Sequence, residues 1–273
     1  MRYSVIIILT LITFIASAQK KEVEVYHKTQ EDGSLKIFAR NNTEFLQSVQ
    51  IEATFKGMEA SEDLPILKTI EPNQSAYYFS LTPVKNAYSY NYRFTYIKGD
   101  VTAEHNDDII YYLPYAQSKS YMVDQSYNET PTHMNQYALD FHMDEGTEIR
   151  AIRAGVVFEV VDNNNKGCPR EDCSKFNNYV LVMHDDGSIA DYSHLQKNGA
   201  RVEVGDEITS GDLIGLSGST GYASGPHLHL EVYVMRFSGQ QSVRAEYYLD
   251  KSTIGVPMSN HRYTQEMDKK NPD

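Results

Sequence analysis

The stretch that most constrains the fold of this chain is residues 225–232, which read Gly-Pro-His-Leu-His-Leu-Glu-Val. Polar and apolar residues alternate along it, and this is the pattern of a half-buried β-strand. Side chains two positions apart on a strand lie on the same face. His227, His229 and Glu231 therefore share one face, and the intervening apolar residues point into a core. Two imidazoles at this spacing suit a metal site, but the motif alone also fits an ordinary histidine pair.

The second half of the chain predicts a compact antiparallel β domain over residues 133–250. Short strand patterns follow one another there, glycines separate them, and no helical periodicity of useful length competes. The expected strands cover residues 148–152, 155–161, 178–184, 189–195, 207–208, 213–216 and 228–234. We expect residues 115–132 to be an extended linker before this domain and residues 251–273 to be a polar C-terminal tail.

Residues 19–114 predict a separate β-sandwich of the immunoglobulin type, from the number and spacing of short strand patterns. Their clearest feature is an aromatic stripe of period two, formed by Tyr88, Tyr90, Tyr92, Phe94 and Tyr96. We expect the stripe to be the inward face of the sandwich. The alternative is a platform that stacks on sugars, but the chain has no Trp, a residue commonly used for that purpose. The fold class is therefore all-β throughout.

Residues 1–18 resemble a secretory signal peptide. Arg2 gives a positive start, residues 5–15 form a short apolar run, and Ala16-Ser17-Ala18 is a typical cleavage signature. Gln19 follows, so the cysteine of a lipid-anchored N-terminus is missing. We expect an exported protein, periplasmic or secreted, without stable membrane insertion.

The formal net charge of −12 argues against binding to nucleic acid or to anionic lipid, because both are themselves negative. Cys168 and Cys173 lie close together in a polar loop. In an exported protein this spacing predicts a small disulfide that pins the loop, since a metal site would need more ligands than the loop offers.

Five residues of the second half form a candidate metal and catalytic set. Catalytic zinc takes three protein ligands, and His133, Asp140 and His229 are the best candidates. His194 and His227 are then placed to transfer protons or to stabilise an oxyanion. Each residue also has a purely structural interpretation, such as a turn cap for Asp140 or a satisfied core histidine for His194.

Two further histidines compete with this set. His142 shares strand parity with Asp140, so it is an alternative ligand if His133 lies too far away. His184 is a second histidine that could be mistaken for a ligand.

These motifs resemble the LytM/lysostaphin-type zinc peptidases, family M23, from about His133 to Val234. The resemblance includes Tyr137-Ala138-Leu139-Asp140-Phe141, Glu145-Gly146-Thr147, Asn178-Tyr179-Val180, Tyr192-Ser193-His194-Leu195 and Gly225-Pro226-His227-Leu228-His229. Its longest part consists of Val202, Gly205, Asp206, Ile208, Gly211, Ile214, Gly215, Gly218, Thr220 and Gly221.

The resemblance implies one Zn²⁺ per chain, with His133, Asp140 and His229 as ligands. It implies His194 and His227 as the catalytic pair that polarises water and stabilises the tetrahedral oxyanion. Members of the family cleave peptide bonds in the stems or cross-links of bacterial peptidoglycan, so the implied partners are peptidoglycan peptides.

The chain departs from the family pattern in two places. Six residues separate His133 from Asp140, where many members have three, and Ala190 stands where many have Thr. The cysteine loop looks like an insertion near the rim of the site.

Three hypotheses follow. The first is an exported zinc endopeptidase that hydrolyses peptidoglycan, which we favour because no ligand is missing from the sequence. The second is a catalytically silent LytM-type domain that binds cell wall or activates another wall hydrolase. The third is an adhesion or scaffold protein in which the β-sandwich is the working part. A regulatory protein partner is compatible with all three.

Overall fold

The computed structural model describes residues 21–266, so the expected signal peptide lies outside the described residues. Within this range the chain is all-β, as predicted, apart from a single 3₁₀-helix, η1 (Glu171–Phe176). The described residues include no helix that is long and apolar enough to cross a membrane.

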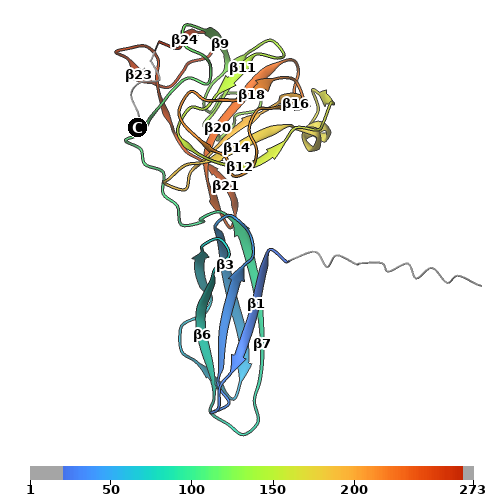
Figure 1. Ribbon diagram of the computed structural model, residues 1–273, viewed down its shortest axis with the longest axis vertical. Coiled ribbons are helices and arrows are strands. Elements are labelled where there is room, and N and C mark those ends of the chain that lie inside the picture. Colours follow the sequence, from blue (N-terminus) through green and yellow to red (C-terminus); the bar gives the residue numbers. More distant parts are fainter. Residues whose placement is uncertain (1–20, 267–273) are drawn as a thin grey trace, which may run out of the picture.

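The first unit consists of two antiparallel sheets, with strand orders β1-β2-β6-β4 and β5-β3-β7 (Figure 1). Its strands are β1 (Val23–Thr29), β2 (Leu35–Asn41), β3 (Gln47–Lys56), β4 (Met58–Ala60), β5 (Ile66–Ile70), β6 (Ser75–Pro83) and β7 (Ser89–Lys98). Buried residues of both sheets form one core, in which Ile37 and Phe79 of one sheet meet Val49 and Ile51 of the other. The immunoglobulin type of this unit stays a prediction.

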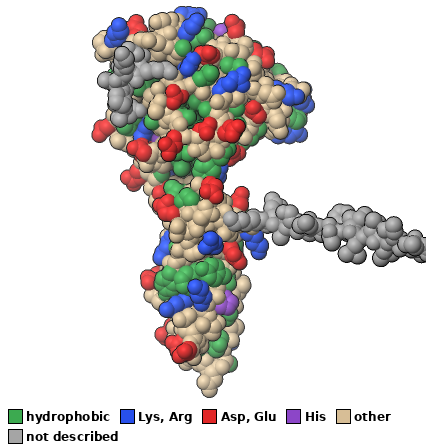
Figure 2. Space-filling view, in the orientation of Figure 1, with side chains coloured by type: hydrophobic (Ala, Val, Ile, Leu, Met, Phe, Trp, Pro, Cys, Tyr) green, Lys and Arg blue, Asp and Glu red, His purple; other side chains and the backbone are tan. Residues whose placement is uncertain are grey.

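The aromatic stripe of β7 is less buried than we expected. Phe94 and Tyr96 pair with the fully buried Ile51 and Val49 of β3, so they point to the core side of the sheet. However, their exposed fractions are 37% and 40%, and that of Tyr88 is 47%. The reason is the position of β7, which pairs only with β3 and so forms the edge of its sheet. Figure 2 shows hydrophobic side chains gathered in a patch on the visible face of this unit.

The second unit is built on a nine-stranded sheet with the order β17-β12-β14-β15-β20-β10-β9-β24, and β21 also pairs with β20. A smaller sheet, β11-β18-β16, covers its apolar face. The main core therefore lies between Leu228 and Leu230 of β20 on one side and Ile149, Leu195 and Ile214 on the other.

The elements of this unit are β8 (Ile110–Tyr111), β9 (Ser120–Gln125), β10 (Ala138–His142), β11 (Glu148–Arg150), β12 (Gly155–Val161), β13 (Gly167–Cys168), β14 (Tyr179–Met183), β15 (Ile189–Ser193), β16 (Leu195–Ala200), β17 (Glu207–Ile208), β18 (Leu213–Ser217), β19 (Gly221–Tyr222), β20 (His227–Arg236), β21 (Gly239–Ser242), β22 (Glu246–Tyr248), β23 (Ile254–Gly255) and β24 (Arg262–Thr264).

The structure differs from the expected domain division in two places. Residues 115–132, expected to be a linker, contain β9, which pairs with β10 inside the large sheet. Residues 251–266, expected to belong to a tail, contain β24, which pairs with β9. The Tyr115 hydroxyl also donates to the carbonyl oxygen of Tyr263 at 2.7 Å. Both segments are polar and short, so their sequences carry little alternation, and only pairing with neighbours makes them strands.

The two units lie end to end (Figure 1) and make specific contacts where they meet. Phe45 packs edge-on against Phe158, with ring centroids 5.1 Å apart. The Arg236 guanidinium donates to the carbonyl oxygens of Val101 and Ala103, at 3.0 and 2.9 Å. The junction therefore lies beside β12 and β20, two central strands of the large sheet.

Candidate metal centre and flanking histidines

Two of the candidate ligands are brought together by strand pairing. Asp140 of β10 lies directly opposite His229 of β20 in the antiparallel register. Directly opposed residues project from the same face, and their side chains are neighbours. His229 Nδ1 lies 3.0 Å from Asp140 Oδ1.

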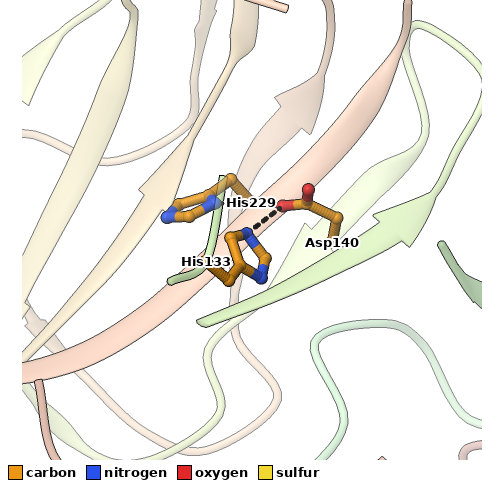
Figure 3. Close-up of side chains that lie close together, drawn as sticks. All are labelled: His133, Asp140 and His229. Atoms are coloured by element: carbon orange, nitrogen blue, oxygen red, sulfur yellow. Dashed lines mark hydrogen bonds and ion pairs between the residues drawn. The ribbon is translucent and has the colours of Figure 1, made fainter. Parts of the chain in front are cut away.

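The third candidate ligand reaches the same point from a loop. His133 is fully buried in the segment before β10, and its Nε2 lies 3.3 Å from Asp140 Oδ1 (Figure 3). Its backbone N–H donates to Glu129 O at 3.0 Å, and its Nδ1 lies 3.1 Å from Ser126 O. Because a carbonyl oxygen only accepts, Nδ1 carries the proton and Nε2 presents its lone pair.

This cluster fits a zinc ion. The three ligand atoms lie within 4.8 Å of one another. Tetrahedral zinc bonds of about 2.0–2.2 Å place ligand atoms roughly 3.3 Å apart, close to the two separations from Asp140. His133 Nε2 is buried without a hydrogen-bond partner, as a ligand atom aimed at a metal would be. Three protein ligands leave a fourth position for water or substrate.

The charges of the cluster support the same interpretation. Burial would raise the pKa of the Asp140 carboxyl, but the adjacent imidazoles of His133 and His229 hold it well below its usual range. Burial would likewise lower the pKa of His229, but the Asp140 carboxylate raises it to about 9. A metal ion must therefore replace the proton that these groups share, so metal binding releases a proton.

His194 and His227 lie beside the cluster. Their ring centroids are 4.6 Å apart, and that of His194 is 5.9 Å from that of His229. His194 Nδ1 lies 2.7 Å from Thr220 O and His227 Nδ1 lies 2.9 Å from Gly225 O, so both rings keep Nε2 free to accept a proton. Burial lowers the pKa of His194 to about 3, and the neighbouring histidines add to the effect. His194 is therefore a neutral base.

The backbone of His194 is held in an unusual conformation. Its φ is 67°, in the left-handed region that residues with a Cβ rarely adopt. The His194 N–H donates to Asn177 Oδ1 at 3.0 Å, and Asn177 Nδ2 donates to Ser193 Oγ at 2.8 Å. Ser193 Oγ in turn donates to Asp191 Oδ1 at 2.6 Å. This chain fixes the turn between β15 and β16 that carries the ring.

The two competing histidines lie outside the cluster. His142 is opposite His227 on the site face, but it is exposed and its Nδ1 contacts Asp124 at 2.9 Å. His184 is buried elsewhere, with Nδ1 donating to Ala154 O at 2.8 Å. Cys168 and Cys173 form a disulfide, so their sulfurs are not thiolate ligands.

The sequence analysis missed Asn177, Thr220 and Ser126, which hold the histidines through hydrogen bonds. Asn177 had a detectable signal, since it precedes a quoted motif. Thr220 belongs to the quoted glycine-rich pattern but was given no role, and Ser126 acts through a backbone carbonyl that no sequence pattern marks. It also gave no role to Asp191 and Glu231, although Glu231 shares strand parity with His229. These two carboxylates are paired across β15 and β20 beside the cluster.

One aspartate and two histidines converge in this β fold, and two more histidines lie beside them. This arrangement defines a site of the metallohydrolase type. Comparison with known proteins agrees. Residues 134–244 match peptidase family M23. The chain is 38% identical over 105 residues to the glycyl-glycine endopeptidase ALE-1 of Staphylococcus capitis, a match that covers 38% of this chain and 26% of the relative. It is 36% identical over 95 residues to the peptidoglycan DD-endopeptidase ShyA of Vibrio cholerae, covering 35% and 19%.

Among solved structures, the catalytic domain of lysostaphin from Staphylococcus simulans is 31% identical, with 46% of this chain and 88% of that chain covered and a TM-score of 0.34. The matches span between 19% and 31% of the length of the first curated relatives. Residues 134–244 of this chain are a lysostaphin/LytM-type domain of peptidase family M23, a family of zinc metallopeptidases. His133 lies one residue before the matched range.

Proposed function

We propose that this protein is an exported, periplasmic or secreted, zinc-dependent endopeptidase that hydrolyses peptide bonds in the stems or cross-links of peptidoglycan. The observation that carries the proposal is the convergence of His133, Asp140 and His229 with the neutral His194 and with His227. Relatives named for cleaving glycyl-glycine and peptidoglycan bonds support the substrate class. Because those relatives act on different bonds, we propose peptidoglycan as the substrate without specifying which of its peptide bonds is cut.

The five residues divide into ligands and proton-handling groups. His133, Asp140 and His229 would hold one Zn²⁺, which supplies a Lewis acid that polarises a carbonyl and acidifies water. His194 Nε2 accepts the proton of the attacking water, because its ring is neutral and oriented by Thr220 O. His227, whose Nδ1 is fixed by Gly225 O, stabilises the charge that develops on the carbonyl oxygen when its Nε2 carries a proton and can donate to that oxygen.

The test measures zinc content and reaction products on the same preparation. Purified protein without residues 1–18 should contain one zinc per chain and should release peptide-linked fragments from purified peptidoglycan. A chelator should abolish the release, and added zinc should restore it. Mass spectrometry of the fragments would identify the bond. Zinc without products would support the catalytically silent alternative, and absence of zinc would contradict the ligand set.

A further inference from the structure

A cavity adjoins the metal centre on the same face of the large sheet. Alternation along β20 places His229, Glu231, Tyr233 and Met235 on one face. Tyr233 and Met235 line a cavity of about 330 Å³, which also receives Asp191 of β15 and Tyr179 of β14. At about 3.3 Å per residue, Asp191 lies roughly 7 Å and Tyr233 roughly 13 Å along the sheet from His229. An extended peptide with its scissile bond at the metal would place neighbouring side chains in this cavity.

Lys98 of the first unit also lines the cavity. Its ammonium donates to Phe158 O at 2.6 Å and lies 4.3 and 4.0 Å from the ring centroids of Phe45 and Phe158. It also lies 3.9 Å from Glu159 Oε2, and the Tyr179 hydroxyl donates to Glu159 Oε1 at 2.7 Å. The Glu159 carboxylate thus has two partners within this chain, and one of them is the Lys98 ammonium.

Asp191 and Glu231 have far fewer partners. Asp191 accepts one hydrogen bond, from Ser193 Oγ. Glu231, directly opposite, has an exposed fraction of 6%, and its side-chain carboxylate accepts no hydrogen bond from any group in residues 21–266. Two adjacent carboxylates with one donor between them carry a desolvation cost in their ionised form, and either a proton or a nearby cation relieves it. The rings of Tyr179 and Tyr233 in the same cavity would favour that cation further.

We propose that this cavity is a substrate subsite that binds a free primary ammonium group on the peptide, with Asp191 as its counter-ion. The inference rests on the proposed function and adds the chemical class of group that the enzyme recognises near the scissile bond. The first unit takes part, because Lys98 lines the cavity and lies 3.9 Å from Glu159 Oε2, which leaves Asp191 as the carboxylate without a cationic partner for the substrate to meet.

The experiment compares two forms of one substrate. The free amino groups are counted with fluorodinitrobenzene on a separate sample of purified peptidoglycan. The untreated remainder is divided, and one half is acetylated with acetic anhydride. The wild-type protein should release fragments from the native form with a kcat/KM about tenfold higher than from the acetylated form. Asp191→Asn loses the charge and keeps an oxygen that accepts from Ser193, which supports the turn carrying His194, so the ratio of the native to the acetylated rate should fall from about ten to about one.

Controls separate recognition from general charge and from folding. Asp108→Asn removes one exposed carboxylate and should keep the tenfold preference. Tyr233→Leu should reduce the preference without removing it. The comparison of the two substrates with wild-type protein needs no variant, so a poorly folded Asp191→Asn does not prevent the test.

Equal wild-type rates on the two forms would overturn the ammonium subsite, as would an Asp191→Asn variant that slows both forms equally. Absence of release from both forms by the wild type would overturn the proposed function, and the subsite with it.

Discussion

The candidate zinc ligands are held in place in two different ways. Asp140 and His229 sit on neighbouring strands, and the register of β10 and β20 alone puts them face to face. His133 sits in a loop, and its position depends on hydrogen bonds with segments that are distant in the sequence. All three were named as candidates from the sequence, and alternation put His229 on the polar face of its strand, but only the structure shows how the loop brings His133 to the strand-borne pair.

The loop that carries His133 is braced from the C-terminal side. The Glu129 carboxylate accepts from the N–H of Ser126 at 2.9 Å and from the hydroxyl of Ser259 at 2.8 Å. The Ser126 hydroxyl donates to Pro257 O at 2.7 Å. These contacts brace the segment immediately before His133, whose backbone N–H and Nδ1 are bonded to the same segment, and so hold the imidazole beside Asp140 although six residues separate the two in sequence. Residues 257–259, expected to belong to a tail, thus support the metal site.

The largest expected effect separates ligands from proton-handling residues. His229→Ala removes a strand-borne ligand and should abolish both zinc binding and hydrolysis. His194→Ala should keep one zinc per chain and lower kcat by about 10²- to 10⁴-fold, because it removes only proton transfer. Zinc content by mass spectrometry and fragment release from peptidoglycan measure the two effects. Full activity in His194→Ala would contradict the role given to that residue.

The stability of the second unit, whose large sheet carries Asp140 and His229, should fall in acid because of His184. Burial lowers the pKa of His184 to about 4, and its Nε2 has no partner. The folded pKa is below the unfolded value, so the unfolded chain binds the proton more readily and stability falls as pH drops from about 6.5 towards 4. Between pH 7.5 and 5 this group should cost about 2 kcal/mol of the free energy of unfolding.

Urea unfolding of metal-free protein at the two pH values measures this loss. His184→Gln should be less stable at pH 7.5 and should show a pH dependence smaller by the same amount. The other histidines are common to both proteins, so an unchanged pH dependence would contradict a buried, neutral His184.

Zinc affinity should fall after a substitution near the loop-borne ligand, His133, at a residue that does not itself bind the metal. Glu129→Ala removes the brace between Ser126 and Ser259 and should lower zinc affinity about tenfold, because supporting hydrogen bonds of this kind contribute 10- to 100-fold. Competition with a chromogenic chelator measures the affinity. Glu145→Ala, an exposed acid in the turn after β10, is the matched control. Equal affinities for the two variants would mean that the sheet positions His133 without help from the loop.

The same contrast explains how much the sequence could predict. Alternation around His229 and the glycine-punctuated strands predicted an all-β second half and its core, because burial of one sheet face imposes period two. Asp140, His194 and His227 come together as expected since they lie on or next to those strands. The strands β9 and β24 were missed because short polar segments become strands only through their neighbours.

Loop ligands and edge strands depend on contacts far apart in the sequence. Alternation correctly gave the direction of the aromatic stripe in β7, but it carries no information about which strand lies at an edge. The exposure of Phe94 and Tyr96 therefore required the structure.

The smallest expected effect concerns β7, the edge strand that carries the aromatic stripe. Tyr92 packs against the core of the first unit, and its hydroxyl lies 3.3 Å from His27 Nδ1. Tyr92→Ala should destabilise the first unit by about 1 kcal/mol, less than a fully buried aromatic residue would, and should leave zinc content unchanged. Tyr88→Ala, at the exposed end of the stripe, should change the free energy of unfolding very little. If the two variants were equally neutral, the whole stripe would be a surface feature of β7, and the core of the first unit would not depend on it.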